Sequence, residues 1–271
     1  MCNIITVKMN KRNQAFSLVE LSIVIIILGL LVASVTVGKD LIQAAQLRGL
    51  ISQIHGFETQ TSTFKLKYDA LPGDISNADK RGLGSNNGDD DGVLEDGTAD
   101  TTPDTANYEL VYFWEHLNNA GFADGAYDGD STNGVIGETF PKAKHGGGIV
   151  VYGVSGVNYY HIGIEDSTTG SPSTLSFADS LVPEDAFSID NKLDDGYPLK
   201  GKMVARSASC SSDPSSFTCA NTAITTTSGG ASQTAGEACV LQSSGTQDAD
   251  LDEYDFETTV NKCQLRLQMN N

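Results

Sequence analysis

The chain has 271 residues, of which 35 are acidic and 17 are basic, and its formal net charge is −18. An acidic balance of this size argues against nucleic acid as a partner, because the phosphates would be repelled. Only 39% of the residues are hydrophobic, which is typical of a loop-rich, β-containing domain outside the cytoplasm. The length allows one large domain, or two small ones, beside an apolar segment.

That apolar segment covers residues 16–38 and follows a short basic leader, residues 1–15, which has lysine and arginine but no acidic residue. A bilayer core takes about 20 apolar helical residues to cross, so the segment is long enough to span a membrane. Glu20 is its only charged residue. Positive charge on the N-terminal flank predicts that this end stays in the cytoplasm while the rest is translocated. No small-residue cleavage site follows the segment, so we expect it to be kept.

The helix is predicted to continue through residues 39–70, where apolar side chains recur at helical spacing and form one stripe. The stripe consists of Leu47, Leu50, Ile51, Ile54, Phe57, Thr61 and Phe64. A helix with one apolar face packs that face against a globular domain. We therefore expect residues 71–271 to form a globular head, packed on the second half of one long N-terminal helix.

Within the head, residues 105–121 are predicted to form a second amphipathic helix that ends at Gly121. The glycine-punctuated run of residues 146–165 predicts a β-hairpin that turns near Ser155. Residues 197–207 and 238–242 are further strand candidates. The expected fold class is therefore α+β, with a small antiparallel sheet beside the long helix.

Four of the five cysteines lie in the last quarter of the chain, in a segment rich in serine, threonine and glycine; they are Cys210, Cys219, Cys239 and Cys263. No C-x-x-C motif is present, so zinc binding and thioredoxin-like chemistry are unsupported. Behind a membrane segment, these cysteines predict two disulfides formed in an oxidising compartment. Three pairings are possible, and the sequence does not choose between them.

One acidic loop resembles the first half of an EF-hand calcium loop, in which oxygen ligands alternate along the chain and a glycine follows. Its candidate ligands are Asn87, Asp89, Asp91, the carbonyl of Val93, and Glu95. The twelfth position is Thr98, where an EF-hand has glutamate. Calcium is thus the candidate cofactor, although none is required for the expected function. The competing interpretation is a solvated turn, because asparagine, aspartate and glycine are also common turn residues.

Two further acidic groups have the same composition and the same two interpretations. They are Asp124, Asp128 and Asp130 in one loop, and Asp190, Asp194 and Asp195 in another. Catalytic motifs are missing from the sequence: it contains no nucleophile elbow, no H-E-x-x-H and no P-loop. The four histidines are scattered along the chain, so we expect packing or surface roles for them and no enzymatic activity.

The stretch A-F-S-L-V-E, residues 15–20, stands after the basic leader and opens the apolar run. It resembles the class III signal of type IV prepilins and pseudopilins. The resemblance implies that prepilin peptidase cleaves between Ala15 and Phe16 and N-methylates Phe16. Glu20 would then be the fifth residue of the mature chain. The residue before the cut is usually glycine in that family, and this chain has Ala15 there.

The resemblance also implies a type IV pilin-like fold, whose N-terminal helices stack in the centre of a filament. The carboxylate of Glu20 would meet the amine of Phe16 on a neighbouring subunit, which offsets the penalty of burying either charge alone. Implied partners are identical or related pilin subunits, prepilin peptidase and, before assembly, the bacterial inner membrane. The protein would then sit in a periplasmic or cell-surface filament.

Three head segments, K-Y-D-A-L-P-G-D, F-W-E-H-L-N-N-A-G and S-I-D-N-K-L-D-D-G-Y-P-L-K-G-K-M-V, look like segments of proteobacterial prepilin-like proteins. They do not distinguish a pilus subunit from a pseudopilin of a type II secretion system. The alternative function is a single-pass, membrane-anchored binding protein whose leader is never removed and whose acidic domain lies outside the cytoplasm.

Overall fold

The computed structural model describes residues 17–94, 108–130, 132, 134–154, 156–164, 180–206, 239–241 and 253–270. The chain divides into two compact units, with the boundary between Ala45 and Gln46. Its elements are, in chain order, α1 (Leu18–Tyr68), α2 (Ala78–Arg81), α3 (Glu109–Asn119), β1 (Gly148–Val154), β2 (Val157–Ile164), α4 (Pro183–Leu193), β3 (Met203–Arg206), β4 (Val240–Leu241), β5 (Glu253–Tyr254) and β6 (Gln264–Gln268). The expected α+β class, a long N-terminal helix followed by a part with a small antiparallel sheet, is confirmed.

Helix α1 contributes to both units. In the N-terminal unit its described side chains are exposed throughout the apolar run. In the second unit it carries the predicted apolar stripe, six members of which are buried: Leu47, Leu50, Ile54, Phe57, Thr61 and Phe64. The seventh, Ile51, is partly buried against the same core. This second part of α1 is therefore a structural helix of the head.

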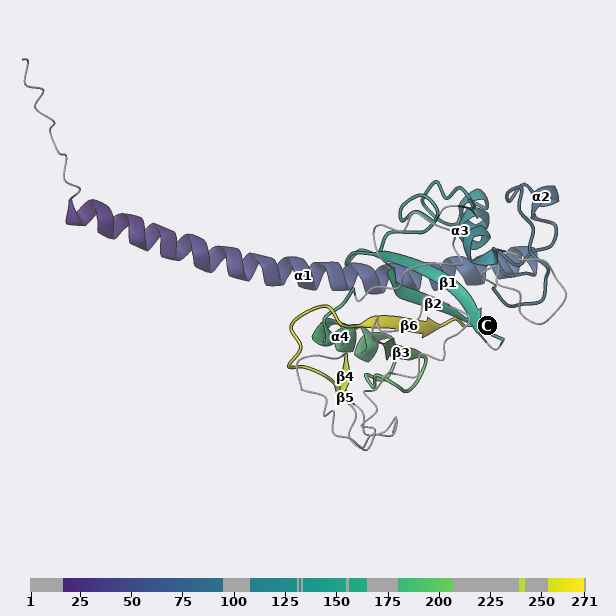
Figure 1. Ribbon diagram of the computed structural model, residues 1–271. Coiled ribbons are helices and arrows are strands. Elements are labelled where there is room, and N and C mark those ends of the chain that lie inside the picture. Colours follow the sequence, from purple (N-terminus) through teal and green to yellow (C-terminus); the bar gives the residue numbers. More distant parts are fainter. Residues whose placement is uncertain are drawn as a thin grey trace, which may run out of the picture. The chain divides into compact units, whose positions relative to one another are not determined.

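The main sheet of the head has four strands in the order β1-β2-β6-β3, all antiparallel (Figure 1). The predicted hairpin is present as β1 and β2, with Val154 opposite Val157. The last strand, β6, lies between β2 and β3, so Leu267 has Tyr160 on one side and Met203 on the other. The end of the chain thus completes the middle of the sheet.

The core joins α1, α3 and the sheet through aromatic side chains. The ring of Phe57 on α1 meets that of Trp114 on α3 edge to face, with 4.8 Å between centroids. Phe113 packs against Tyr160 on β2, whose hydroxyl hydrogen-bonds the Thr61 hydroxyl on α1 at 2.8 Å. Burying each of these side chains contributes roughly 1.5–3 kcal/mol, so this cluster accounts for much of the attachment of α1 to the head.

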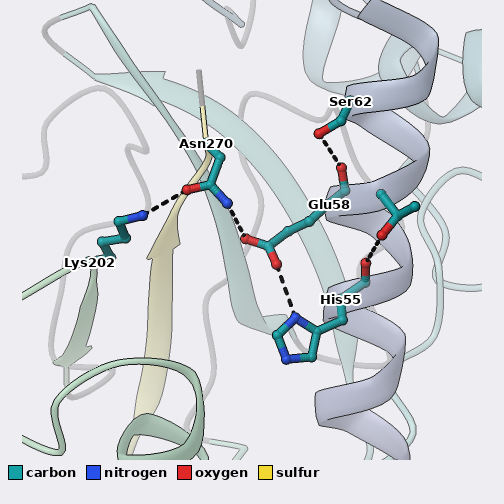
Figure 2. A network of polar contacts seen from close by, with 6 residues as sticks. His55, Glu58, Ser62, Lys202 and Asn270 are labelled. Carbon is teal, nitrogen blue, oxygen red and sulfur yellow. Dashed lines mark hydrogen bonds and ion pairs between the residues drawn. The ribbon is translucent and has the colours of Figure 1, made fainter.

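A polar network on the surface adds to that attachment (Figure 2). The Asn270 side chain, just after β6, donates to Glu58 Oε1 on α1 at 3.0 Å and accepts from Lys202 Nζ at 2.8 Å. Glu58 Oε2 in turn lies 3.2 Å from His55 Nδ1, one turn earlier on α1. Asn270 is therefore tied to both α1 and the loop before β3.

The remaining elements form a smaller layer. Strands β4 and β5 pair with each other, and Phe187 of α4 packs against Tyr254 of β5. A disulfide joins Cys239 to Cys263, which links the residue before β4 to the residue before β6. This is one of the pairs allowed by the sequence; Cys210 and Cys219 lie outside the described residues.

Candidate functional site

The first candidate site is the N-terminus of α1, where Glu20 takes part in a capping box. The Ser17 backbone N–H donates to Glu20 Oε2 at 2.9 Å, and the Val19 backbone N–H donates to Ser17 Oγ at 3.3 Å. Such reciprocal bonds satisfy backbone donors that the first turn of a helix leaves unpaired. The capping box places the Glu20 carboxylate at Ser17, the residue next to Phe16. Phe16 and Ala15 themselves lie outside the described residues.

Within the described part of the chain, α1 is the helix whose length and composition would allow it to cross a membrane. Two of its serine side chains in this part of α1 are satisfied locally. Ser22 Oγ donates to the Val19 carbonyl at 2.8 Å, and Ser34 Oγ donates to the Leu30 carbonyl at 2.5 Å. Hydroxyls paired with their own helix add little cost in an apolar medium, so Glu20 is the one strongly polar group on this surface from Leu18 to Gly38.

The second candidate site is acidic and lies in the head. It brings together Asp74, Asp89 and Asp91, with one carboxylate oxygen of each within 4.8 Å of the others. Two of these residues were predicted as calcium ligands, whereas Asp74 was not. Of the other predicted ligands, Asn87 accepts a hydrogen bond from the Asp79 backbone N–H at 3.1 Å. Val93 follows the cluster, and its backbone N–H donates to Asp91 Oδ1 at 2.7 Å; Glu95 lies outside the described residues.

Asp74 is the buried member of this cluster, with 3% of its surface exposed. Its Oδ2 accepts a hydrogen bond from the Gly92 backbone N–H at 3.1 Å, while its buried Oδ1 has no hydrogen-bond partner among the described residues. Burial, first, and then the negative charge of Asp91 raise the pKa of Asp74 to about 6, against the Gly92 hydrogen bond, which lowers it. The site therefore holds one carboxylate whose environment opposes its charge.

His116 of α3 holds together the two chain segments that carry these carboxylates. The Gly73 backbone N–H donates to His116 Nδ1 at 2.9 Å. Since a carbonyl only accepts, His116 Nε2 carries the proton and donates it to the Asn86 carbonyl oxygen at 3.0 Å. Burial lowers the pKa of His116 to about 4, so the ring is neutral at pH 7. Both ring nitrogens are used for structure.

The backbone of the loop at Gly88 also lies directly against the backbone of Asp74 and Ile75. The Gly88 N–H donates to the Ile75 carbonyl at 3.0 Å, and the Asp90 N–H donates to the Asp74 carbonyl at 2.8 Å. A Cβ at position 88 would lie 2.3 Å from the carbonyl carbon and oxygen of Asp74. Only glycine fits here without a shift of the backbone. The Asp89 backbone N–H also donates to Glu109 Oε1 at 3.1 Å, which ties the loop to the first turn of α3.

The second acidic cluster consists of Asp190, Asp194 and Asp195, again with oxygens within 4.8 Å of one another. Here much of the acceptor capacity is used by the fold. Asp194 Oδ2 accepts from the backbone N–H groups of Met203, at 2.9 Å, and Lys202. Asp190 Oδ2 accepts from the Tyr254 hydroxyl at 2.7 Å, while its buried Oδ1 has no hydrogen-bond partner among the described residues. Burial raises the pKa of Asp190 to about 7. These carboxylates connect the end of α4 to β3 and β5.

The third acidic group, Asp124, Asp128 and Asp130, is not gathered into a cluster of this kind within the described residues. Asp128 Oδ1 accepts from the Asp130 N–H at 3.1 Å, and Asp130 Oδ1 accepts from the Thr132 N–H at 2.8 Å. This is the geometry of consecutive turns stabilised by aspartate, as the solvated-turn interpretation predicts.

Comparison with known proteins gives one match. Residues 10–36 fit the model of the prokaryotic N-terminal methylation motif, the prepilin-type cleavage and methylation signal. The matched range includes Ala15, Phe16 and Glu20. No curated protein and no solved structure matches the chain.

Proposed function

We propose that the chain is a structural subunit, pilin or pseudopilin, of a type IV pilus-like or type II secretion filament. The match of residues 10–36 to the methylation motif carries the proposal, because that motif supports a substrate of prepilin peptidase. In the proposal, cleavage between Ala15 and Phe16 removes the leader, and the inner membrane holds the subunit through α1 until it is assembled.

The exposed apolar surface of α1 supports assembly through this helix. Between Leu18 and Val35 its apolar side chains are more than half exposed, a surface that soluble monomers do not leave uncovered. Lipid covers it before assembly, and neighbouring α1 helices cover it in the filament. A heterologous contact of this kind repeats without closing, which is how filaments grow.

Glu20 would then have a second role beside its capping box. Its carboxylate lies one residue from the amine that cleavage would create on Phe16, so a neighbouring subunit's Glu20 and Phe16 amine can pair in the filament core. Pairing offsets the cost of burying each charge, and a single polar pair fixes the axial register of stacked helices. The capping box needs only a hydrogen-bond acceptor at position 20, whereas the ion pair with the Phe16 amine needs a negative charge there.

That difference gives the test. Glu20→Gln keeps the capping acceptor, since glutamine also serves in capping boxes, but removes the charge. Each variant would be expressed in the native host in place of the wild-type subunit, and its amount would be measured in membranes and in the sheared filament fraction. We expect Glu20→Gln and Glu20→Ala to insert normally and to be depleted from filaments.

Two matched variants serve as controls. Ser17→Ala weakens the cap but keeps the charge, and Asp40→Asn removes an exposed acid from the same helix; both should enter filaments normally. Normal incorporation of Glu20→Gln would limit Glu20 to helix capping. If the wild-type protein also stays in the membrane with its leader attached, the chain is instead a membrane-anchored binding protein.

A further inference from the structure

The carboxylate pocket around Asp74 is unusual in its charges. Asp74 is almost fully buried, and its Oδ1 has no hydrogen-bond partner among the described residues. The neighbouring charges that raise its pKa are those of Asp91, Asp89 and Asp90. An isolated buried charge costs several kcal/mol, and buried charges are therefore normally paired or bound to a metal.

Basic side chains do not supply the missing partner within the described residues. Lys65 and Arg81 line the same cavity of about 460 Å³ as Asp74 and Asp91. Arg81 Nη1, however, donates to the Tyr68 carbonyl at 3.0 Å, and neither cation forms an ion pair with Asp74 among the described residues. Asp74 Oδ1 therefore lacks a basic partner within the described part of the chain.

The donor atoms define the kind of cation. The group offers carboxylate oxygens and no nitrogen or sulfur, which disfavours zinc and favours a hard ion. Calcium takes six to eight oxygen ligands at about 2.3–2.6 Å, so two of its ligands can be at most about 5 Å apart. The three carboxylates, with oxygens within 4.8 Å of one another, meet that condition. Calcium also tolerates irregular geometry, whereas magnesium requires a near-ideal octahedron.

We propose that Asp74, Asp89 and Asp91 bind a calcium ion. Asp74 enters from the segment that follows α1, and the other two come from the loop before residue 94, so the ion would join two segments that are 15 residues apart. The neutral His116 ring and the close contact at Gly88 already hold these segments in place. The site is therefore largely preformed by the fold, and the proposal does not depend on whether the chain assembles into a filament.

The proposal predicts opposite effects of one substitution with and without calcium. Asp74→Asn has the same shape but no charge, so in a chelator such as EGTA the variant should melt at the same temperature as the wild type or higher. With calcium a hundredfold above its dissociation constant, the wild type should melt roughly 5–10 °C higher than in chelator. Asp74→Asn should show little of this rise, and the order of stabilities should reverse.

The experiment uses the full-length chain in detergent, with melting followed by fluorescence and binding by calorimetric titration of calcium chloride. Asp74→Asn should weaken calcium binding by roughly tenfold or more, since ligand charge sets affinity. Asp79→Asn, an exposed acid five residues away, should bind like the wild type. Magnesium at the same concentration should produce a smaller rise in melting temperature.

Several results would overturn the proposal. These are an absence of calcium binding by the wild type, equal binding by Asp74→Asn, or equal stabilisation by magnesium and calcium. Loss of binding in Asp190→Asn but not in Asp74→Asn would place the ion in the other acidic cluster. Because Asp74→Asn is expected to be folded and stable in chelator, a folding defect cannot imitate the expected outcome.

Discussion

Mild acid should destabilise the head through His116. This ring accepts a hydrogen bond from the Gly73 N–H and donates one to the Asn86 carbonyl. Protonation would replace the acceptor at Nδ1 with a second N–H pointing at a donor, in a fully buried position. The fold therefore stabilises the neutral ring, and burial lowers its pKa from 6.5 to about 4.

The direction and the size of the change in unfolding free energy with pH follow from this pKa shift. Between pH 6.5 and 4 the unfolded chain binds a proton at this histidine that the folded chain does not, so stability falls as the pH falls through this range. A pKa lowered from 6.5 to about 4 corresponds to a loss of about 3 kcal/mol between pH 7 and pH 4. The raised pKa values of Asp74 and Asp190 act in the opposite direction, because the folded chain binds these protons more readily than the unfolded chain. The effect of His116 must therefore be read as a difference between variants.

The assay compares urea unfolding of the wild type and His116→Gln from pH 7 to pH 4, in EGTA and detergent. Fluorescence of the only tryptophan, Trp114, reports the transition because this side chain is buried two residues from the histidine. The wild type should lose about 3 kcal/mol more than the variant over this range. His55→Gln, at a side chain that is 58% exposed, should follow the wild type. Parallel pH curves for the wild type and His116→Gln would refute the reasoning.

Three further predictions concern stability of the head, each measured as the free energy of unfolding in urea. Replacing both Cys239 and Cys263 with serine opens a loop with a sequence separation of 24 and should cost about 3 kcal/mol; a cost that persists when the wild type is also reduced would contradict this. Gly88→Ala should cost about 1–3 kcal/mol because the new Cβ would clash with the Asp74 backbone. Gly56→Ala, where nothing lies within 4 Å of the new Cβ, should instead stabilise α1 by up to about 1 kcal/mol. Equal effects of the two substitutions would rule out the close contact between Gly88 and Asp74. Glu58→Gln, in the network of Figure 2, should cost under about 1 kcal/mol because ion pairs at the surface contribute little. A larger loss would show that this network contributes more than ordinary surface pairs do.

The sequence predicted the elements whose signals are local. The apolar run and the stripe from Leu47 to Phe64 have helical period over many turns, and α1 follows both. The hairpin of β1 and β2 was readable from a run of β-formers interrupted by a turn, because its two strands are neighbours in the chain. In such cases short-range pattern and tertiary structure agree, which makes prediction reliable.

Strand β6 was missed although it lies in the middle of the main sheet. Its five residues carry a weak alternation, with Leu265 and Leu267 buried, and its partner β2 lies about a hundred residues earlier. Helix α4 was missed as well, despite Pro183 in its first turn followed by two acids, the usual signal of a helix start. The aspartates at the end of that helix, from Asp190 to Asp195, were interpreted as an acidic loop instead.

The candidate sites show the same limit. Asp89 and Asp91 were found because they alternate within one loop, but Asp74 joins them only through the fold, and no spacing rule connects it to them. The signal readable there was the Pro72-Gly73 pair, which marks a turn; in the structure Gly73 has a positive φ of 91° and approaches the Glu109 carbonyl closely. At the N-terminus, the S-x-x-E pattern of Ser17 and Glu20 was a readable capping box that the apolar context concealed.

The central claim is that prepilin peptidase processes this chain, and the mass of its N-terminal peptide tests that claim most directly. The protein would be taken from its native membrane or sheared surface fraction and analysed intact and after digestion. We expect a mature chain that begins with N-methylated Phe16 and lacks residues 1–15. A chain that still carries residues 1–15 would contradict the proposal, and the protein would then be a membrane-anchored binding protein that never enters a filament.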